Sequence, residues 1–180
     1  MKRFPVFFLI LSVLGLLSSC GYTSTRILPA HYRTIYVEPI QNKIPITEEI
    51  GEKAGFVTNF PQIEERVTRE AINQFLADVN LRIVNKPEGA DLMLTGNLRD
   101  FYRQAVRRRE DNTVEEYRLN LTASVTLRDK QGKLLLEEPA LIGDSTYFLT
   151  GPTSKTESAA VDDLVTDFSR RVVEWVIEYW

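Results

Sequence analysis

The clearest pattern in the chain is a strict alternation of apolar and polar residues over positions 117–128. The odd positions are apolar or aromatic, and the even positions carry arginine, asparagine, threonine or serine. A period of two is typical of a strand with one face in a core and the other in water. A similar alternation begins at residue 92 and extends to about residue 102. Because Asp111 and Asn112 lie between the two segments, we predict a β-hairpin.

Two further segments have the spacing of amphipathic helices. In residues 63–79, apolar residues recur at every fourth position, directly after Pro61, a residue favoured in the first turn of a helix. This segment predicts a helix of about five turns. Residues 161–179 predict a second, long helix, with Ser154 or Thr156 as its cap.

Shorter apolar segments complete the predicted fold. Residues 34–38, 81–84 and 134–142 have strand character, whereas residues 41–59 are polar and predict a loop. The resulting element order is β-α-β-β-β-β-α. It predicts an α+β, two-layer sandwich, with a mostly antiparallel or mixed sheet of four to five strands and two helices on one face.

The N-terminus has the pattern of an export signal. Lys2 and Arg3 precede an apolar segment at residues 4–17, which is too short to span a bilayer core of about 30 Å. The segment ends in Leu17-Ser18-Ser19-Cys20, which resembles a bacterial lipobox. We expect cleavage before Cys20 and its modification by an S-linked diacylglycerol and an N-linked acyl chain. The alternatives are a plain signal peptide with an incidental cysteine, or a short core strand.

This interpretation divides the chain into a signal peptide at 1–19, a lipidated tether at 20–33 and a single domain at 34–180. Several acyl chains, at about 0.8 kcal/mol per buried CH₂ group, give the stable membrane attachment that one chain does not. Gly21 follows the cysteine in place of the aspartate that is associated with inner-membrane retention, which favours the outer membrane.

Composition excludes several classes of function. The 180 residues include 22 lysines and arginines against 25 acids, so a net charge of −3 argues against general nucleic-acid binding. One cysteine and one histidine leave no basis for a disulfide framework or a thiolate zinc site. Phosphate-loop and nucleophile-elbow motifs are absent from the sequence. We therefore expect no catalytic residue, no metal and no cofactor other than the lipid on Cys20.

The ordered combination of segments resembles the LptE family of lipopolysaccharide-assembly lipoproteins. The segments that carry this resemblance are Cys20-Gly21-Tyr22, Leu28-Pro29-Ala30-His31, Thr34-Ile35-Tyr36-Val37-Glu38-Pro39, residues 88–96, residues 116–121, residues 143–148 and the final helix. The resemblance implies a lipid-anchored layer of two helices on a sheet. It also implies a partner, the β-barrel protein LptD, whose lumen the lipoprotein plugs, and a role in placing lipopolysaccharide in the outer leaflet. It transfers no individual lipopolysaccharide-contacting residue onto this chain.

Arginine is concentrated in and around the predicted hairpin. Five arginines and a single acid, Asp100, lie between residues 99 and 109. The full candidate set for binding lipid A phosphates or an acidic barrel wall is Arg99, Arg103, Arg107, Arg108, Arg109, Arg118 and Arg128.

The alternation predicts that Arg99, Arg103 and Arg107 share the open face of the sheet. A hairpin closed symmetrically near Asn112 would place Arg107 opposite Arg118, and a bound anion would relieve that repulsion. The alternative is a solvated face, in which the arginines are balanced by neighbouring acids, namely Glu110, Asp111, Glu115 and Glu116.

Two other functions remain open from the sequence alone. The first is a periplasmic lipoprotein adaptor for a cell-wall synthase or a secretion complex. The second is a hydrolase that uses carboxylates of the loop at 41–59, such as Glu48 and Glu49, although no visible constraint places those acids as a pair.

Overall fold

The computed structural model describes residues 29, 31–45, 60–78 and 80–178. The signal peptide, Cys20 and most of the tether lie outside these residues, as do Glu48 and Glu49. The elements in chain order are β1 (Thr34–Val37), β2 (Gln41–Asn42), α2 (Ile63–Ala77), β3 (Arg82–Ile83), a 3₁₀ turn (Pro87–Gly89), β4 (Leu92–Arg108), β5 (Val114–Asp129), β6 (Leu134–Phe148) and α3 (Glu157–Glu178).

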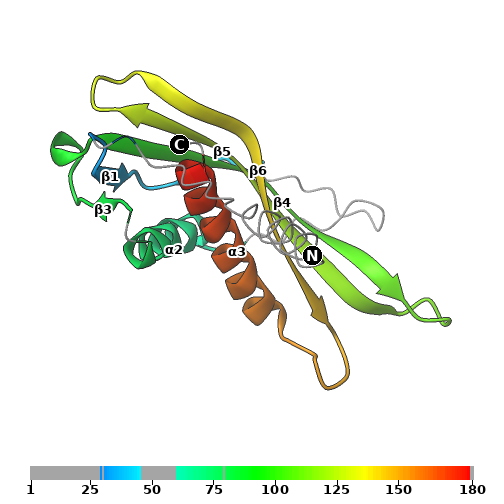
Figure 1. Cartoon of the computed structure of the whole chain (residues 1–180). Coiled ribbons are helices and arrows are strands. Elements are labelled where there is room, and N and C mark those ends of the chain that lie inside the picture. The colour runs from blue at the N-terminus through cyan, green and yellow to red at the C-terminus, as the bar shows by residue number, and fades with distance from the viewer. Residues whose placement is uncertain (1–28, 30, 46–59, 79, 179–180) are drawn as a thin grey trace, which may run out of the picture.

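One mixed sheet of six strands forms the first layer (Figure 1). Its strand order is β3-β1-β4-β5-β6, and β2 pairs separately with β4. β1 runs parallel to β3 and β4, whereas β4, β5 and β6 form an antiparallel meander. The sheet is open, and the predicted α+β class is confirmed. The two-residue strand β2 lies within the segment that was predicted to be a loop.

Both helices cover the same face of the sheet (Figure 1). The odd positions of β5 from Leu119 to Leu127 are at most 1% exposed and form the floor of the core. Phe168 of α3 is fully buried against this floor, and Phe75 of α2 is fully buried in the same core. Burial of apolar area at about 25 cal/mol per Å² is the main stabilising term, so the alternation in β5 fixes which face the helices cover.

Gly143 allows α3 to approach β6 closely. A Cβ atom at Gly143 would lie 2.6 Å from Cβ and 2.7 Å from Cα of Phe168. No real side chain shows contacts this short, and one of these two atoms belongs to the backbone. The glycine therefore sets the distance between the helix layer and the edge strand.

The predicted helix boundaries are largely confirmed. Thr156 caps α3, because its Oγ1 accepts a hydrogen bond from the Ala159 amide at 3.2 Å. α2 has 15 residues, about four turns, and ends at Ala77. Strand β6 extends to Phe148, beyond the predicted end at residue 142. No helix within the described ranges is long and apolar enough to cross a membrane.

Candidate functional site

The face of the sheet opposite the helices is polar, as the alternation predicts. On this face, Thr95 and Thr126 share a hydrogen bond of 2.5 Å between their hydroxyl groups. Beside them, Nε of Arg99 donates to Oγ of Ser124 at 3.1 Å. Arg99 thus lies on this face, and one of its donors is already used within the sheet.

A β-bulge at Arg99 reverses the alternation along β4. Leu98 pairs with Ala123, but the next residue in register is Asp100, which pairs with Thr122. Arg99 is the extra residue, and beyond it the odd positions of β4 face the helices. Phe101 is accordingly 1% exposed. The prediction that Arg103 shares the open face with Arg99 and Arg107 is therefore wrong.

Arg103 instead lies on the helix side, at the start of α3. Its Nη1 is 2.9 Å from Oε1 of Glu157, and its guanidinium carbon is 4.6 Å from the centre of the Tyr117 ring. Burial on its own lowers the pKa of Arg103, but interactions with Tyr147 and Glu157 outweigh burial and raise it. Arg103 therefore links β4 to α3 as a permanent cation.

The expected like-charge contact between Arg107 and Arg118 does not form. A second irregularity in β4 places Arg107 opposite Glu116, with Nε 3.7 Å from the carboxylate, and Arg118 lies opposite Gln104. Arg107 also lies over the Phe148 ring, at 5.6 Å from its centre. The hairpin closes asymmetrically. The repulsion between Arg107 and Arg118 that a bound anion would relieve is therefore absent, and Arg107 forms an ion pair with Glu116 instead.

The other arginines at the two ends of the hairpin also contact the fold. Arg109 approaches Glu115 at 3.7 Å and donates to the Thr150 hydroxyl at 2.9 Å. Arg108 and Arg128 donate to backbone carbonyls in the turns that follow them, at 3.0 and 3.1 Å. Exposed side chains with such weak partners retain donors for a ligand, although acids balance the cations at Arg107 and Arg109.

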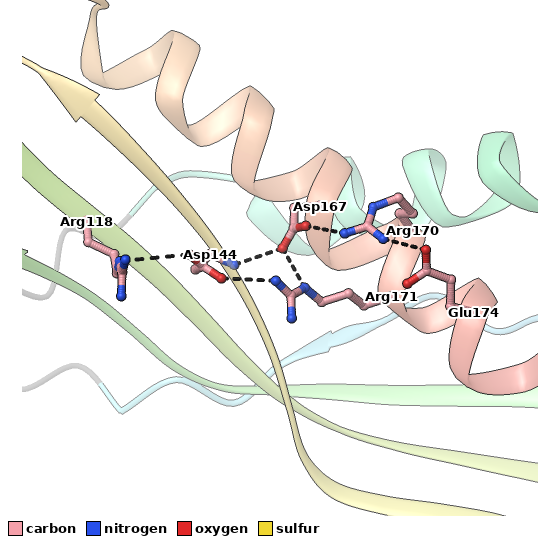
Figure 2. A network of polar contacts seen from close by, with 6 residues as sticks. All are labelled: Arg118, Asp144, Asp167, Arg170, Arg171 and Glu174. Carbon is pink, nitrogen blue, oxygen red and sulfur yellow. Dashed lines mark hydrogen bonds and ion pairs between the residues drawn. The ribbon is translucent and has the colours of Figure 1, made fainter. Parts of the chain in front are cut away.

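Arg118 belongs to a network that reaches from the polar face to the helix layer (Figure 2). Its Nε is 3.8 Å from Oδ2 of Asp144 on edge strand β6. The other oxygen of Asp144 accepts from Nη2 of Arg171 in α3 at 3.0 Å. One carboxylate therefore joins the two layers at the edge of the sheet.

Asp167 continues this network along α3 (Figure 2). Its carboxylate accepts from the Asp144 amide at 3.0 Å and from Nε of Arg171 at 2.7 Å. Burial on its own raises the pKa of Asp167, but these hydrogen bonds and one from Arg170 outweigh burial and lower it. Asp167 accepts the hydrogen bond of the outward-facing Asp144 amide on edge strand β6. That amide is then not available to pair with another strand, so Asp167 also protects this edge.

The structure thus separates the seven candidate arginines into different environments. Arg99, Arg107, Arg118 and Arg128 lie on the polar face or its rim, Arg108 and Arg109 lie at the hairpin end, and Arg103 lies among the helices. The sequence did not identify Asp144, Asp167 or Arg171, because their relation depends on where α3 packs.

The described residues contain no group of three side chains that could hold a metal ion. The side chains of the polar face supply hydrogen-bonding and ion-pairing groups. The face carries guanidinium, hydroxyl, amide and carboxylate groups, and a binding role fits this arrangement.

Comparison with family models identifies the chain. Residues 32–174 match the model of LptE, described as lipopolysaccharide-assembly. The chain belongs to the LptE family. LptE is a non-catalytic family of lipopolysaccharide-assembly lipoproteins of the cell envelope, and the match includes every strand of the sheet and most of α3. A comparison with curated proteins found no match.

Solved structures share the LptE-like fold of this chain at low sequence identity. A hypothetical protein from Chlamydia trachomatis is 10% identical, with a TM-score of 0.55 over 82% of this chain and 97% of its own. An uncharacterized lipoprotein B from Nitrosomonas europaea is 11% identical, with a TM-score of 0.55 over 82% of this chain and 84% of its own. At these identities the similarity concerns the fold alone.

Proposed function

We propose that this chain is an outer-membrane lipoprotein that occupies the lumen of an LptD-like β-barrel and supports lipopolysaccharide assembly in the outer leaflet. The observation that carries the proposal is the family match over residues 32–174. The lipobox-like segment ending at Cys20 supports lipid anchorage. The acyl chains on Cys20 would hold the domain at the periplasmic leaflet, next to the barrel.

The polar face of the sheet supports a role inside a barrel. The interior of an outer-membrane barrel is polar, and a plug must offer it hydrogen-bonding groups. The face has them in Thr95, Thr126 and Ser124, which already bond within the sheet and are preordered. A binding surface with fixed side chains loses less entropy on association.

The exposed arginines are proposed to contact lipopolysaccharide phosphates or an acidic barrel wall. The exposed residues are Arg99, Arg107, Arg108, Arg109 and Arg118, and the half-buried Arg128 is proposed together with them. Their guanidinium groups are suited to phosphate, and the ion pairs of Arg107, Arg109 and Arg118 are long, at 3.7, 3.7 and 3.8 Å. Arg103 is assigned a positioning role, because Glu157 and Tyr117 already enclose it.

A native pull-down tests the proposal. The full-length lipidated chain is expressed in its source organism, outer membranes are extracted in mild detergent, and co-purifying proteins are identified and quantified by mass spectrometry. We expect one large β-barrel protein in stoichiometric amount, and we expect Cys20→Ala to remove the chain from the outer membrane. Recovery with a cell-wall enzyme in place of a barrel would overturn the plug function and favour an adaptor.

A further inference from the structure

Asn120 is a buried amide at the centre of the polar face. It is 7% exposed, and within the described ranges its Nδ2 has no hydrogen-bond partner. An unpaired buried donor costs free energy, on the order of 1–3 kcal/mol, and is rare in native structures. The unpaired Nδ2 of Asn120 therefore indicates a donor that a bound ligand could use.

The side chains around Asn120 form a regular grid over three strands. Tyr102 of β4 and Asp144 of β6 lie directly opposite Asn120, on either side. The row on one side of Asn120 consists of Asp100, Thr122 and Ile142. The row on the other side consists of Gln104, Arg118 and Thr146. From strand spacing and rise, the grid measures about 10 Å by about 13 Å, which is suited to a short oligosaccharide.

We propose that this grid is a binding site for an uncharged saccharide, with Nδ2 of Asn120 as its central donor. The proposal rests on the proposed function only for the source of the sugar, which would be the oligosaccharide part of lipopolysaccharide. It shares Arg118 with the phosphate contacts proposed for the arginines, and its other members take no part in them.

The charges of the grid favour a neutral ligand over a phosphate. Asp100 and Asp144 supply two carboxylates, and Arg118 supplies one guanidinium. The nearby cation of Arg171 is held by Asp144 and Asp167, so it does not leave an excess of positive charge (Figure 2). A phosphate on Asn120 would meet the two carboxylates, whereas sugar hydroxyls can donate to carboxylates and accept from Asn120 and Arg118.

The grid also offers apolar surface to the C–H faces of a sugar. The Tyr102 ring is half-buried beside Asn120, and Ile142 is 49% exposed on the same face. Ligand sites typically combine such surface with a few placed polar groups. Arg118 is half-exposed, and its ion pair is long at 3.8 Å, so it can move aside to admit a ligand to Asn120.

A peptide fits this grid less well than a saccharide. An extended peptide typically binds to a sheet by hydrogen bonds to an unpaired strand edge. Asn120 lies on β5, which pairs with β4 on one side and β6 on the other, so its backbone groups are used within the sheet. Only side chains are available to a ligand here, and they are mixed donors and acceptors.

Saturation-transfer difference NMR on the full lipidated protein in detergent micelles tests the site. The probe is the deacylated, dephosphorylated oligosaccharide prepared from lipopolysaccharide of the source organism. We expect Asn120→Ala to weaken binding at least tenfold and Tyr102→Ala to reduce it. The matched control Asn97→Ala, on the same face but outside the grid, should bind as the unmodified chain does. Phosphorylated lipid A without core sugars can reach the grid only through Arg118, so it should compete at least tenfold less strongly than the oligosaccharide.

Three results would overturn the site. The first is equal binding by Asn120→Ala and the unmodified chain, with both folded by circular dichroism. The second is competition by lipid A as strong as that by the oligosaccharide, and the third is no binding by the unmodified chain. A photo-crosslinking residue at Gln104 that captured only protein in cells would instead assign the grid to a protein contact. If the barrel still co-purifies with Asn120→Ala, failure of the saccharide site leaves the plug function standing.

Discussion

Asp144 and Arg171 form a 3.0 Å ion pair that joins edge strand β6 to helix α3. The same carboxylate lies 3.8 Å from Arg118, so it faces a cation from each layer. The amide of Asp144 is bound in turn by Asp167. Side chain and backbone of one residue therefore hold the helix layer to the edge of the sheet.

Replacing Asp144 tests this junction. We expect Asp144→Ala to lower the free energy of unfolding by about 1 kcal/mol, because it leaves Arg118 and Arg171 without their shared partner while the exposed setting limits the loss. Urea denaturation measures the change. The control Asp162→Ala removes an ion pair to Arg66 whose acid is 69% exposed, and it should cost under about 0.5 kcal/mol. Equal costs would contradict the role of Asp144.

The contact between Gly143 and Phe168 gives a second prediction. We expect Gly143→Ala to destabilise the protein by about 1–3 kcal/mol or more, because the added methyl group meets the backbone of α3. Gly89→Ala is the control, since a Cβ at Gly89 meets nothing within 4 Å. The thermal midpoints of the two variants should differ clearly. A Gly143→Ala variant as stable as the control would show that α3 does not pack as described.

The bulge at Arg99 predicts that two arginines of one strand act differently. We expect Arg103→Met to lower stability by about 1–3 kcal/mol, because Glu157 loses its partner in a half-buried position. Arg99→Met should change stability by less than about 0.5 kcal/mol. Chemical denaturation of both variants separates the two positions. A larger loss for Arg99→Met would place Arg103, not Arg99, on the open face.

The lowered pKa values of Asp91 and Asp167 predict how the free energy of unfolding depends on pH. Hydrogen bonds from the Arg33 amide and from Thr34 lower the pKa of Asp91, and the contacts of Asp167 lower its pKa below the ordinary value of 3.8. A lowered pKa in the folded state means that the unfolded chain binds more protons in acid. The stabilisation is present at neutral pH and is lost as the pH falls below 3.8 toward the lowered values.

Denaturation at a series of pH values checks this prediction. Asp167→Asn cannot titrate at this position, so its stability should fall less steeply than that of the unmodified chain below pH 3.8. The variant should start from a lower stability at neutral pH, since an amide binds Arg170 and Arg171 less strongly. Parallel pH curves for the two proteins would contradict the assignment.

The sequence predicts the layers of this fold well because each rests on local periodicity. The alternation in β5 identifies the buried face, and the apolar residues at every fourth position from Ile63 identify α2. Strand β2 escapes prediction because it has only two residues, which are recognised as a strand by their pairing with Asn97 and Leu98 of β4. Its sequence, Gln41-Asn42, has no strand character of its own.

The candidate site is predicted less well because it depends on register. A signal for the bulge is present, since the buried positions Leu94 and Leu98 are even whereas Phe101 is odd. That change of parity moves Arg103 to the helix side. The asymmetric closure of the hairpin, which pairs Arg107 with Glu116, has no comparable signal. Contacts between Asp144 and α3 require the packed structure.

Surface delivery of lipopolysaccharide tests the central claim most directly. The chain is depleted in its source organism, lipopolysaccharide is pulse-labelled, and the fraction accessible at the cell surface is measured over time. We predict that newly made lipopolysaccharide fails to reach the surface and that the unmodified chain, but not Cys20→Ala, restores delivery. Normal surface delivery in fully depleted cells would contradict the proposed function.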